Sequence, residues 1–204
     1  MRLPPSFFAA LAIWGGCFVL ISKTGSWAPL AVLGPLLAAF VLFTEPQARE
    51  LLRPSVRLLA LGLAGAVVMT ASTYALFGVF ARLAPDLRLL TIGLYNELRA
   101  PSFTPAERAA LVPLVAAAEE VVFRGLALPD GGKGAPRAIA IAVTLNALLV
   151  GVTHLSSGNW LLALVAAICG VAWGTLRVVT RSCVPSIVTH VAWDLAILVV
   201  QPLI

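Results

Sequence analysis

The amino-acid sequence predicts an all-α membrane protein, a polytopic bundle of about seven transmembrane helices plus one interfacial helix. Hydrophobic residues make up 60% of the 204 residues and charged residues only 11%, whereas about a quarter of a soluble domain is charged. A chain this short cannot bury so much apolar surface in one globular core, so lipid must solvate its long apolar runs. The runs follow one another closely, which predicts a single transmembrane domain over residues 1–204.

Composition also limits the expected partners. The formal net charge of +5 indicates basic loops beside a membrane. Basic tracts interleaved with aromatic residues are lacking, so we expect no nucleic-acid partner. Cys17, Cys169 and Cys183 lie in or beside apolar runs without a CxxC pair. We expect them to act as small hydrophobic residues and not as disulfide partners or zinc ligands.

Seven apolar runs approach the length of a membrane span, which is about 20 residues. They cover residues 5–22, 26–43, 56–81, 106–127, 137–155, 159–178 and 183–203. The breaks between them carry turn and charge signals, such as the Gly- and Pro-rich stretch from Pro129 to Pro136. The first run lacks the small-residue cleavage site of a signal peptide, so we interpret it as the first membrane helix.

The longest break, from about Arg82 to Ala106, contains the predicted interfacial helix. Leucines recur at helical spacing between Asp86 and Arg99, with charged residues among them. The segment is too short and too charged to span a bilayer, which favours a helix lying in the interface. An eighth, irregular span is the alternative.

The fourth apolar run begins with a helix-start signal that fixes the depth of the acidic residues after it. Thr104 is a capping residue, Pro105 suits the first helical position and Glu107 completes a capping box. Glu119 lies fourteen residues past Pro105, or about 21 Å along the axis. This places Glu119 inside the hydrocarbon.

Ionisable residues inside the membrane are costly and therefore mark candidate functional sites. They are concentrated in the last four predicted spans: Glu119, Glu120 and Arg124 in the fourth, His154 at the end of the fifth, and His190 and Asp194 in the seventh. His154 and His190 are the only histidines of the chain.

Helical spacing separates these residues into groups. Glu120 and Arg124 are four residues apart with the acid first, which predicts a structural pair on one helix face. Glu119 points about 100° away and is predicted to have no partner on its own helix, which makes it the better candidate for handling protons. His190 and Asp194 share one face of the last span, and His154 must reach them from across the bundle.

Spacing alone leaves three interpretations open. The cluster suits catalysis, but it equally suits an ion or proton pathway. A zinc site is also conceivable, because Glu, His and Asp are zinc ligands. An H-E-x-x-H motif is lacking, however, and the ligands would come from separate helices.

Three motifs taken in order resemble the CPBP family of intramembrane proteases, which includes the CAAX-prenyl endopeptidases. They are Glu119-Glu120-x-x-x-Arg124, then His154, then His190-x-x-x-Asp194. Phe123-Arg124-Gly125 and the stretch from Gly174 to His190 also fit the family. The resemblance covers roughly residues 107–200, whereas the first three spans carry no signal beyond hydrophobicity.

The resemblance implies a role for each matching position. Glu119 is the general base that activates water, with His154 assisting or positioning that water. His190 and Asp194 bind the oxyanion of the tetrahedral intermediate, while Glu120 and Arg124 are structural. No cofactor and no metal ion take part.

Two positions depart from the family pattern. Val150 stands where Phe is frequent, four residues before His154, which bears on packing or substrate fit. Asp194 stands where the CAAX-prenyl endopeptidases have Asn, and an ionised Asp would repel an oxyanion. Asp194 is therefore either protonated or the residue that orients His190, and we favour the second role.

The sequence thus predicts a glutamate-dependent, metal-independent endopeptidase in a cell membrane, with a bacterial inner membrane as the expected location. The expected partners are the lipid bilayer and a membrane-anchored protein or peptide substrate. The alternative is a non-enzymatic transporter or an immunity or scaffold protein that retains the motifs. One difficulty remains: Glu119 and His154 lie at different expected depths. For them to meet, the fifth span must start later or tilt strongly, or the site must lie near the membrane midplane.

Overall fold

The computed structural model describes residues 4–98, 103–128 and 135–203, and these contain helices and no β-strand. The helices are α1 (Pro5–Thr24), α2 (Ala28–Thr44), α3 (Pro46–Glu50), α4 (Val56–Leu83), α5 (Asp86–Leu98), α6 (Pro105–Glu119), α7 (Gly125–Ala127), α8 (Pro136–Leu155), α9 (Trp160–Thr180) and α10 (Val184–Leu195). Two π-helical segments, η1 (Glu120–Arg124) and η2 (Ala196–Val200), extend α6 and α10. The predicted all-α class is confirmed.

Four helices, α1, α4, α8 and α9, are long and apolar enough to cross a membrane. The other predicted spans form shorter apolar helices, α2 and the combined α10 and η2, and the helix α6, whose regular part ends at Glu119. The count of seven spans therefore stays a prediction. Most of the Gly- and Pro-rich loop that begins at Pro129 lies outside the described residues.

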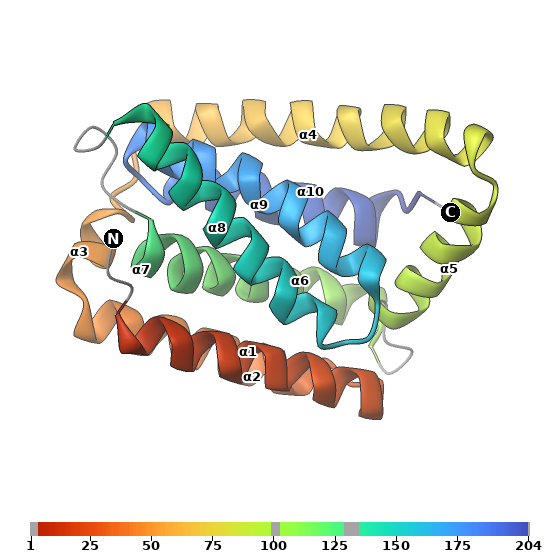
Figure 1. The fold of residues 1–204 in the computed structure, drawn as a ribbon, viewed down its shortest axis with the longest axis horizontal. Helices are drawn as coiled ribbons and strands as arrows, with labels where there is room; N and C mark the ends of the chain where they lie inside the picture. Colours follow the sequence, from red (N-terminus) through yellow and green to blue (C-terminus); the bar gives the residue numbers. More distant parts are fainter. Residues whose placement is uncertain (1–3, 99–102, 129–134, 204) are drawn as a thin grey trace.

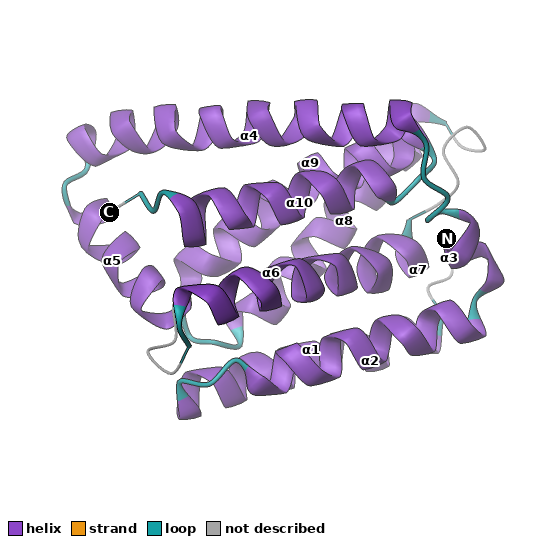
Figure 2. Ribbon diagram, turned by 180° about the vertical axis from the view of Figure 1, so that it is seen from behind, coloured by secondary structure: helices purple, strands orange, loops and turns teal. Residues whose placement is uncertain are grey.

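The helices form a layered bundle (Figure 1). α1 and α2 lie side by side along one edge and α4 lies along the opposite edge, with α6, α8, α9 and α10 between them. α6 contacts α2 on one side and α10 on the other, and α10 also packs against α4 (Figure 2). The motif-bearing helices are therefore the interior of the bundle, and the helices without motifs cover it.

Small residues allow the interior helices to approach closely. A Cβ atom on Gly151 of α8 would lie 3.0 Å from the Ala163 carbonyl oxygen of α9, and one on Gly170 of α9 would lie 3.1 Å from the Ala147 Cβ of α8. Helices in lipid associate through such small-residue contacts, because burial of apolar surface gives little driving force there.

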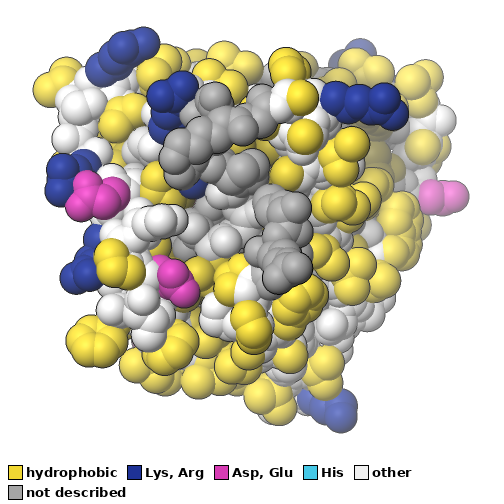
Figure 3. Space-filling model, turned by 60° about the vertical axis from the view of Figure 1, so that its left-hand side comes forward, with side chains coloured by type: hydrophobic (Ala, Val, Ile, Leu, Met, Phe, Trp, Pro, Cys, Tyr) yellow, Lys and Arg dark blue, Asp and Glu magenta, His cyan; other side chains and the backbone are white. Residues whose placement is uncertain are grey.

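The outer surface is apolar, as the lipid environment requires. Only 6% of the most apolar part of α4 is buried, and large hydrophobic side chains such as Val67 and Val68 are exposed on this helix. Figure 3 shows hydrophobic side chains over much of the visible described surface, with charged side chains mostly toward its edges.

Helix α5 occupies the position of the predicted interfacial helix and closes one end of the bundle (Figure 1). Thr91, Leu94 and Tyr95 are buried, whereas Leu89 is exposed. The Tyr95 hydroxyl donates to the Ile197 carbonyl oxygen at 2.6 Å, so α5 is tied to the segment that follows α10. The segment is a regular helix from Asp86 to Leu98. Its place in the membrane interface stays a prediction, and so does the alternative of an eighth span.

The predicted start of α6 is confirmed in detail. The Thr104 hydroxyl accepts from the Glu107 backbone N–H at 3.2 Å, and the Glu107 carboxylate accepts from the Thr104 backbone N–H at 2.7 Å. This capping box satisfies two of the backbone donors at the helix start. It fixes the helix start from which the position of Glu119 is counted.

Candidate active site

A cavity of about 660 Å³ lies among α4, α5, α9 and the inner ends of α6, α8 and α10. All four residues predicted to be catalytic line it: Glu119, His154, His190 and Asp194. Glu120 and Arg124 are not among the described residues that line it; both are completely buried. The structure thus separates the cavity-facing acid from the packed one.

Glu119 does have a partner on its own helix, which corrects the prediction from helical spacing. Arg124 Nη1 lies 3.2 Å from Glu119 Oε1 and 3.5 Å from Glu120 Oε1. In a regular α-helix, residues five apart point about 140° away from each other. The π-helical turn η1, with its i→i+5 hydrogen bonds, brings positions 119 and 124 to the same side.

Arg124 therefore holds both carboxylates and not only Glu120. Its side chain is fully buried, as is that of Glu120. A buried guanidinium is stable only when carboxylates and hydrogen bonds compensate its loss of hydration. The acid pair and the arginine consequently form one electrostatic unit at the base of the cavity.

Glu119 and His154 face each other across the cavity. Glu119 Oε2 lies 3.7 Å from His154 Nε2, while the other carboxylate oxygen contacts Arg124. His154 Nδ1 lies 2.9 Å from the Val150 carbonyl oxygen, a contact that only a protonated Nδ1 can make as donor. A neutral His154 therefore presents an unprotonated Nε2 toward Glu119.

The difference in expected depth between Glu119 and His154 disappears because α8 runs obliquely across the bundle (Figure 1). The Asn146 side-chain amide of α8 donates to the Phe123 carbonyl oxygen of η1 at 3.1 Å. This buried hydrogen bond fixes α8 against the π-helical turn. Since α8 begins at Pro136, it does not start later than the predicted span. Its oblique course is what brings the two residues together, and a site near the membrane midplane stays a prediction.

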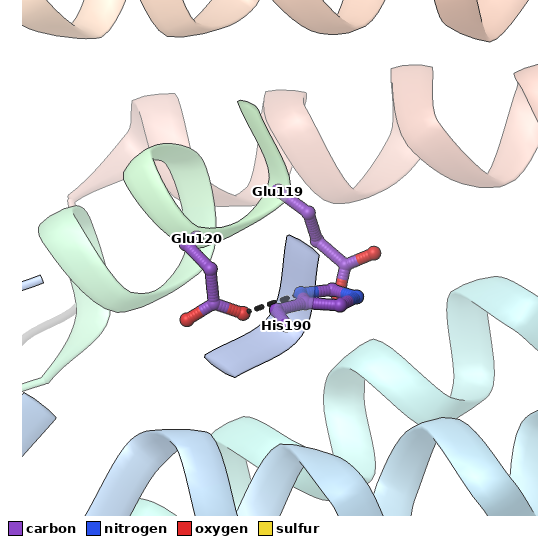
Figure 4. Close-up of side chains that lie close together, drawn as sticks. All are labelled: Glu119, Glu120 and His190. Carbon is purple, nitrogen blue, oxygen red and sulfur yellow. Dashed lines mark hydrogen bonds and ion pairs between the residues drawn. The ribbon is translucent and has the colours of Figure 1, made fainter. Parts of the chain in front are cut away.

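His190 lies between two carboxylates. Its Nδ1 is 3.0 Å from Glu120 Oε1, and its Nε2 is 3.4 Å from Asp194 Oδ2. Figure 4 shows Glu119 and Glu120 extending from adjacent positions toward this ring. A doubly protonated imidazole satisfies both contacts, because each nitrogen then donates. Asp194 has the position expected of a residue that orients His190.

One aromatic side chain packs against each histidine, and no sequence motif includes these aromatic residues. The Phe18 ring centroid lies 4.4 Å from that of His154, and Trp173 stacks on His190 at 3.5 Å. Asn146 was also missed. A single aromatic residue in an apolar run resembles any core residue, so only the buried polar Asn146 carried a signal that the sequence could have given.

A metal ion is the alternative occupant of this cluster. Ligand atoms of Glu119, Glu120 and His190 lie within 4.8 Å of one another, and such groups can bind zinc. The Arg124 guanidinium contacts the same two carboxylates, however, and its positive charge opposes a divalent cation there. The chemistry of the donor set therefore favours proton transfer over metal binding.

The comparisons with known proteins place the site within one family domain. Residues 101–196 match the family model described as type II CAAX prenyl endopeptidase Rce1-like. Neither the curated proteins nor the solved structures gave a match. The matched region contains all six residues that the sequence motifs single out, from Glu119 to Asp194. Residues 101–196 are thus similar to the Rce1-like CAAX prenyl endopeptidases, a protease family, which confirms the predicted resemblance to the CPBP family.

Proposed function

We propose that this protein is an intramembrane endopeptidase that hydrolyses a peptide bond of a membrane-associated protein or peptide by a glutamate-dependent, metal-independent mechanism. The observation that carries the proposal is the separation of 3.7 Å between Glu119 Oε2 and His154 Nε2, with both residues lining one cavity. Both atoms are hydrogen-bond acceptors when His154 is neutral and Glu119 is ionised.

Two acceptors facing each other suit a water molecule that donates one hydrogen to each. Glu119 then removes a proton from this water as its oxygen attacks the substrate carbonyl carbon. The same proton later passes to the nitrogen of the leaving amine as the C–N bond breaks. Arg124 contacts the other oxygen of Glu119 at 3.2 Å, so it orients the carboxylate while leaving Oε2 available.

His190 and Asp194 provide the electrostatic part of the mechanism. The tetrahedral intermediate carries a negative oxygen, which preorganised donors stabilise. In this proposal the His190 imidazolium, held by Glu120 at 3.0 Å, supplies that positive charge on the cavity wall. Asp194 acts by orienting the ring, and its negative charge is balanced by the imidazolium that it contacts.

The shape of the cavity supports a substrate that arrives from the lipid. Leu76 and Phe80 of α4 and Leu164 and Ile168 of α9 line the cavity, and these residues are between 47% and 63% exposed. The cavity is therefore open sideways between these two helices. An apolar chain segment can enter there without passing through water.

The decisive experiment compares membrane proteomes of cells that carry the wild-type protein, Glu119→Gln or His154→Ala. We expect an uncleaved precursor to accumulate with both variants, although the variant proteins remain folded in the membrane. Glu50→Gln serves as control, because Glu50 lies in an exposed pair with Arg53. Full processing by the Glu119→Gln variant would refute the glutamate mechanism.

The metalloprotease alternative has its own test, because the cluster of Glu119, Glu120 and His190 offers ligand atoms within 4.8 Å. Cleavage of the precursor by purified protein is measured with and without a chelator. The proposed mechanism predicts equal rates. A loss that added zinc restores would favour a bound metal ion in place of the glutamate-activated water.

A further inference from the structure

Trp173 occupies the wall of the candidate active site, although no sequence motif includes it. It lies on α9, is only 2% exposed, and lines the cavity together with Glu119 and His190. Gly170, one turn earlier on the same helix, lies close to Arg124. A Cβ atom added to Gly170 would be 3.1 Å from Arg124 Nη2. This approach brings the α9 backbone, and Trp173 with it, against the site.

The Trp173 and His190 rings are stacked face to face. Their centroids are 3.5 Å apart and their planes differ by 17°. Trp193 supports the arrangement from α10 with an edge contact to Trp173 at 5.8 Å, and the Arg124 guanidinium carbon lies 5.7 Å from the Trp173 ring centroid. Trp193 and Arg124 therefore fix the position of the Trp173 ring, and this ring in turn restricts the His190 imidazole.

The contacts of His190 divide into edge contacts and a face contact. Glu120 and Asp194 act on its two nitrogens, which lie on the ring edge. Hydrogen bonds at the edge fix the direction of the nitrogens but leave the ring free to tilt about the line between them. The stacked indole removes this remaining freedom, because tilting would separate the two rings or press them together.

We propose that Trp173 is a positioning residue that fixes the plane of the His190 ring and stabilises its positive charge. The inference rests on the function proposed above for His190. The indole face carries negative partial charge and attracts a cation placed over it, most strongly where water is excluded. Trp173 also closes one face of the ring, which leaves the reacting groups to approach from the other side.

The expected catalytic effect follows from this role. A cation–π contact in a desolvated site contributes roughly ten- to thirtyfold to an equilibrium between charged and neutral forms. We therefore expect Trp173→Leu to lower kcat by about this factor, with KM nearly unchanged. Trp173→Phe keeps an aromatic face and should retain most of the wild-type kcat. If Trp173 only filled space, Trp173→Phe and Trp173→Leu would lower kcat to a similar extent.

Nuclear magnetic resonance of histidine-labelled protein tests the stack without any substrate. The chain has only two histidines, and His190→Gln assigns their signals. We expect the His190 ring protons of the wild type to be shifted upfield by the indole ring current. This shift should be lost in Trp173→Leu and Trp173→Met, and partly kept in Trp173→Phe.

Phe18→Leu is the matched control, since Phe18 contacts the other histidine, His154. It should move the His154 signals and leave those of His190 in place, whereas the Trp173 variants should do the reverse. Kinetics use the precursor that accumulates with Glu119→Gln. His190 signals that are the same in wild type and folded Trp173→Leu, or an unchanged kcat, would overturn the inference.

Failure of the inference and failure of the proposed function are distinguishable. If Glu119→Gln processes the precursor fully, the glutamate mechanism is wrong, whatever the histidine signals show. If Glu119→Gln is inactive and the His190 signals do not respond to Trp173, the mechanism stands and the positioning role is wrong.

Discussion

Gly62→Ala is a one-methyl change, remote from the cavity, that should impair catalysis by moving α10. Gly62 is buried on α4, where its carbonyl oxygen accepts a hydrogen bond from the Thr189 hydroxyl at 2.8 Å. A Cβ at this position would lie 2.6 Å from Val188 Cβ and 3.1 Å from the Pro185 carbonyl oxygen. His190 follows these residues directly on the same helix.

The size of the effect follows from these distances. Ordinary contact begins at 3.4 Å, so Val188 Cβ must recede by about 0.8 Å. A Cβ is bonded directly to Cα, so no side-chain rotation moves it, and α10 itself must shift relative to α4. Such overpacking costs about 1–3 kcal/mol, of which alanine's higher helix propensity offsets about 0.5–1 kcal/mol.

A displacement of this size at His190 should lower the cleavage rate roughly ten- to hundredfold. Thermal unfolding in detergent and cleavage of the accumulated precursor measure the two effects separately. Gly78→Ala, on the same helix with no atom within 4 Å of its added Cβ, is the matched control. It should leave cleavage unchanged and stabilise the fold by about 0.5–1 kcal/mol through helix propensity alone. Wild-type cleavage by Gly62→Ala would refute the reasoning that α10 packing positions His190.

Two further substitutions test the π-helical turn. Arg124→Gln removes the positive charge that one nitrogen, Nη1, presents to both Glu119 and Glu120, so we expect cleavage to fall at least about tenfold; an unchanged cleavage rate would contradict the shared ion pair. Asn146→Leu leaves the buried Phe123 carbonyl oxygen without its donor and should destabilise the fold by about 1–3 kcal/mol. A wild-type midpoint of thermal unfolding would show that this hydrogen bond does not secure α8.

The helices could be predicted from the sequence because their signals are local. The run 56–81 corresponds to α4, Val56–Leu83, and the break after it contains the helix α5. The capping box at Thr104 is observed in full. Hydropathy, turn residues and caps act within a few neighbouring residues, so they do not depend on the packing of distant helices.

The family was likewise recognisable from the chain itself. Three short motifs in order pointed to residues 107–200, and the family model matches residues 101–196. The number of membrane spans was less certain, because α2 and α10 are shorter than a full span. Length and composition define a span only where the helix is long and uninterrupted.

The pairing within the site could not be predicted in the same way. Spacing assigned Arg124 to Glu120, whereas the π-helical turn brings Arg124 to Glu119 as well. A π-turn is a rare interruption within an α-helix, so a spacing rule based on the regular α-helix fails there. The stack of Trp173 on His190 has no local signature at all.

The sequence by itself determined that charged residues lie in apolar helices, which helices carry them and which protease family they resemble. Only the tertiary structure decided which of these groups meet. The oblique course of α8 brings His154 to Glu119, and the π-turn places both carboxylates on one guanidinium. The physical reason is that hydropathy and capping are properties of short segments, whereas contacts depend on how helices tilt and unwind against one another.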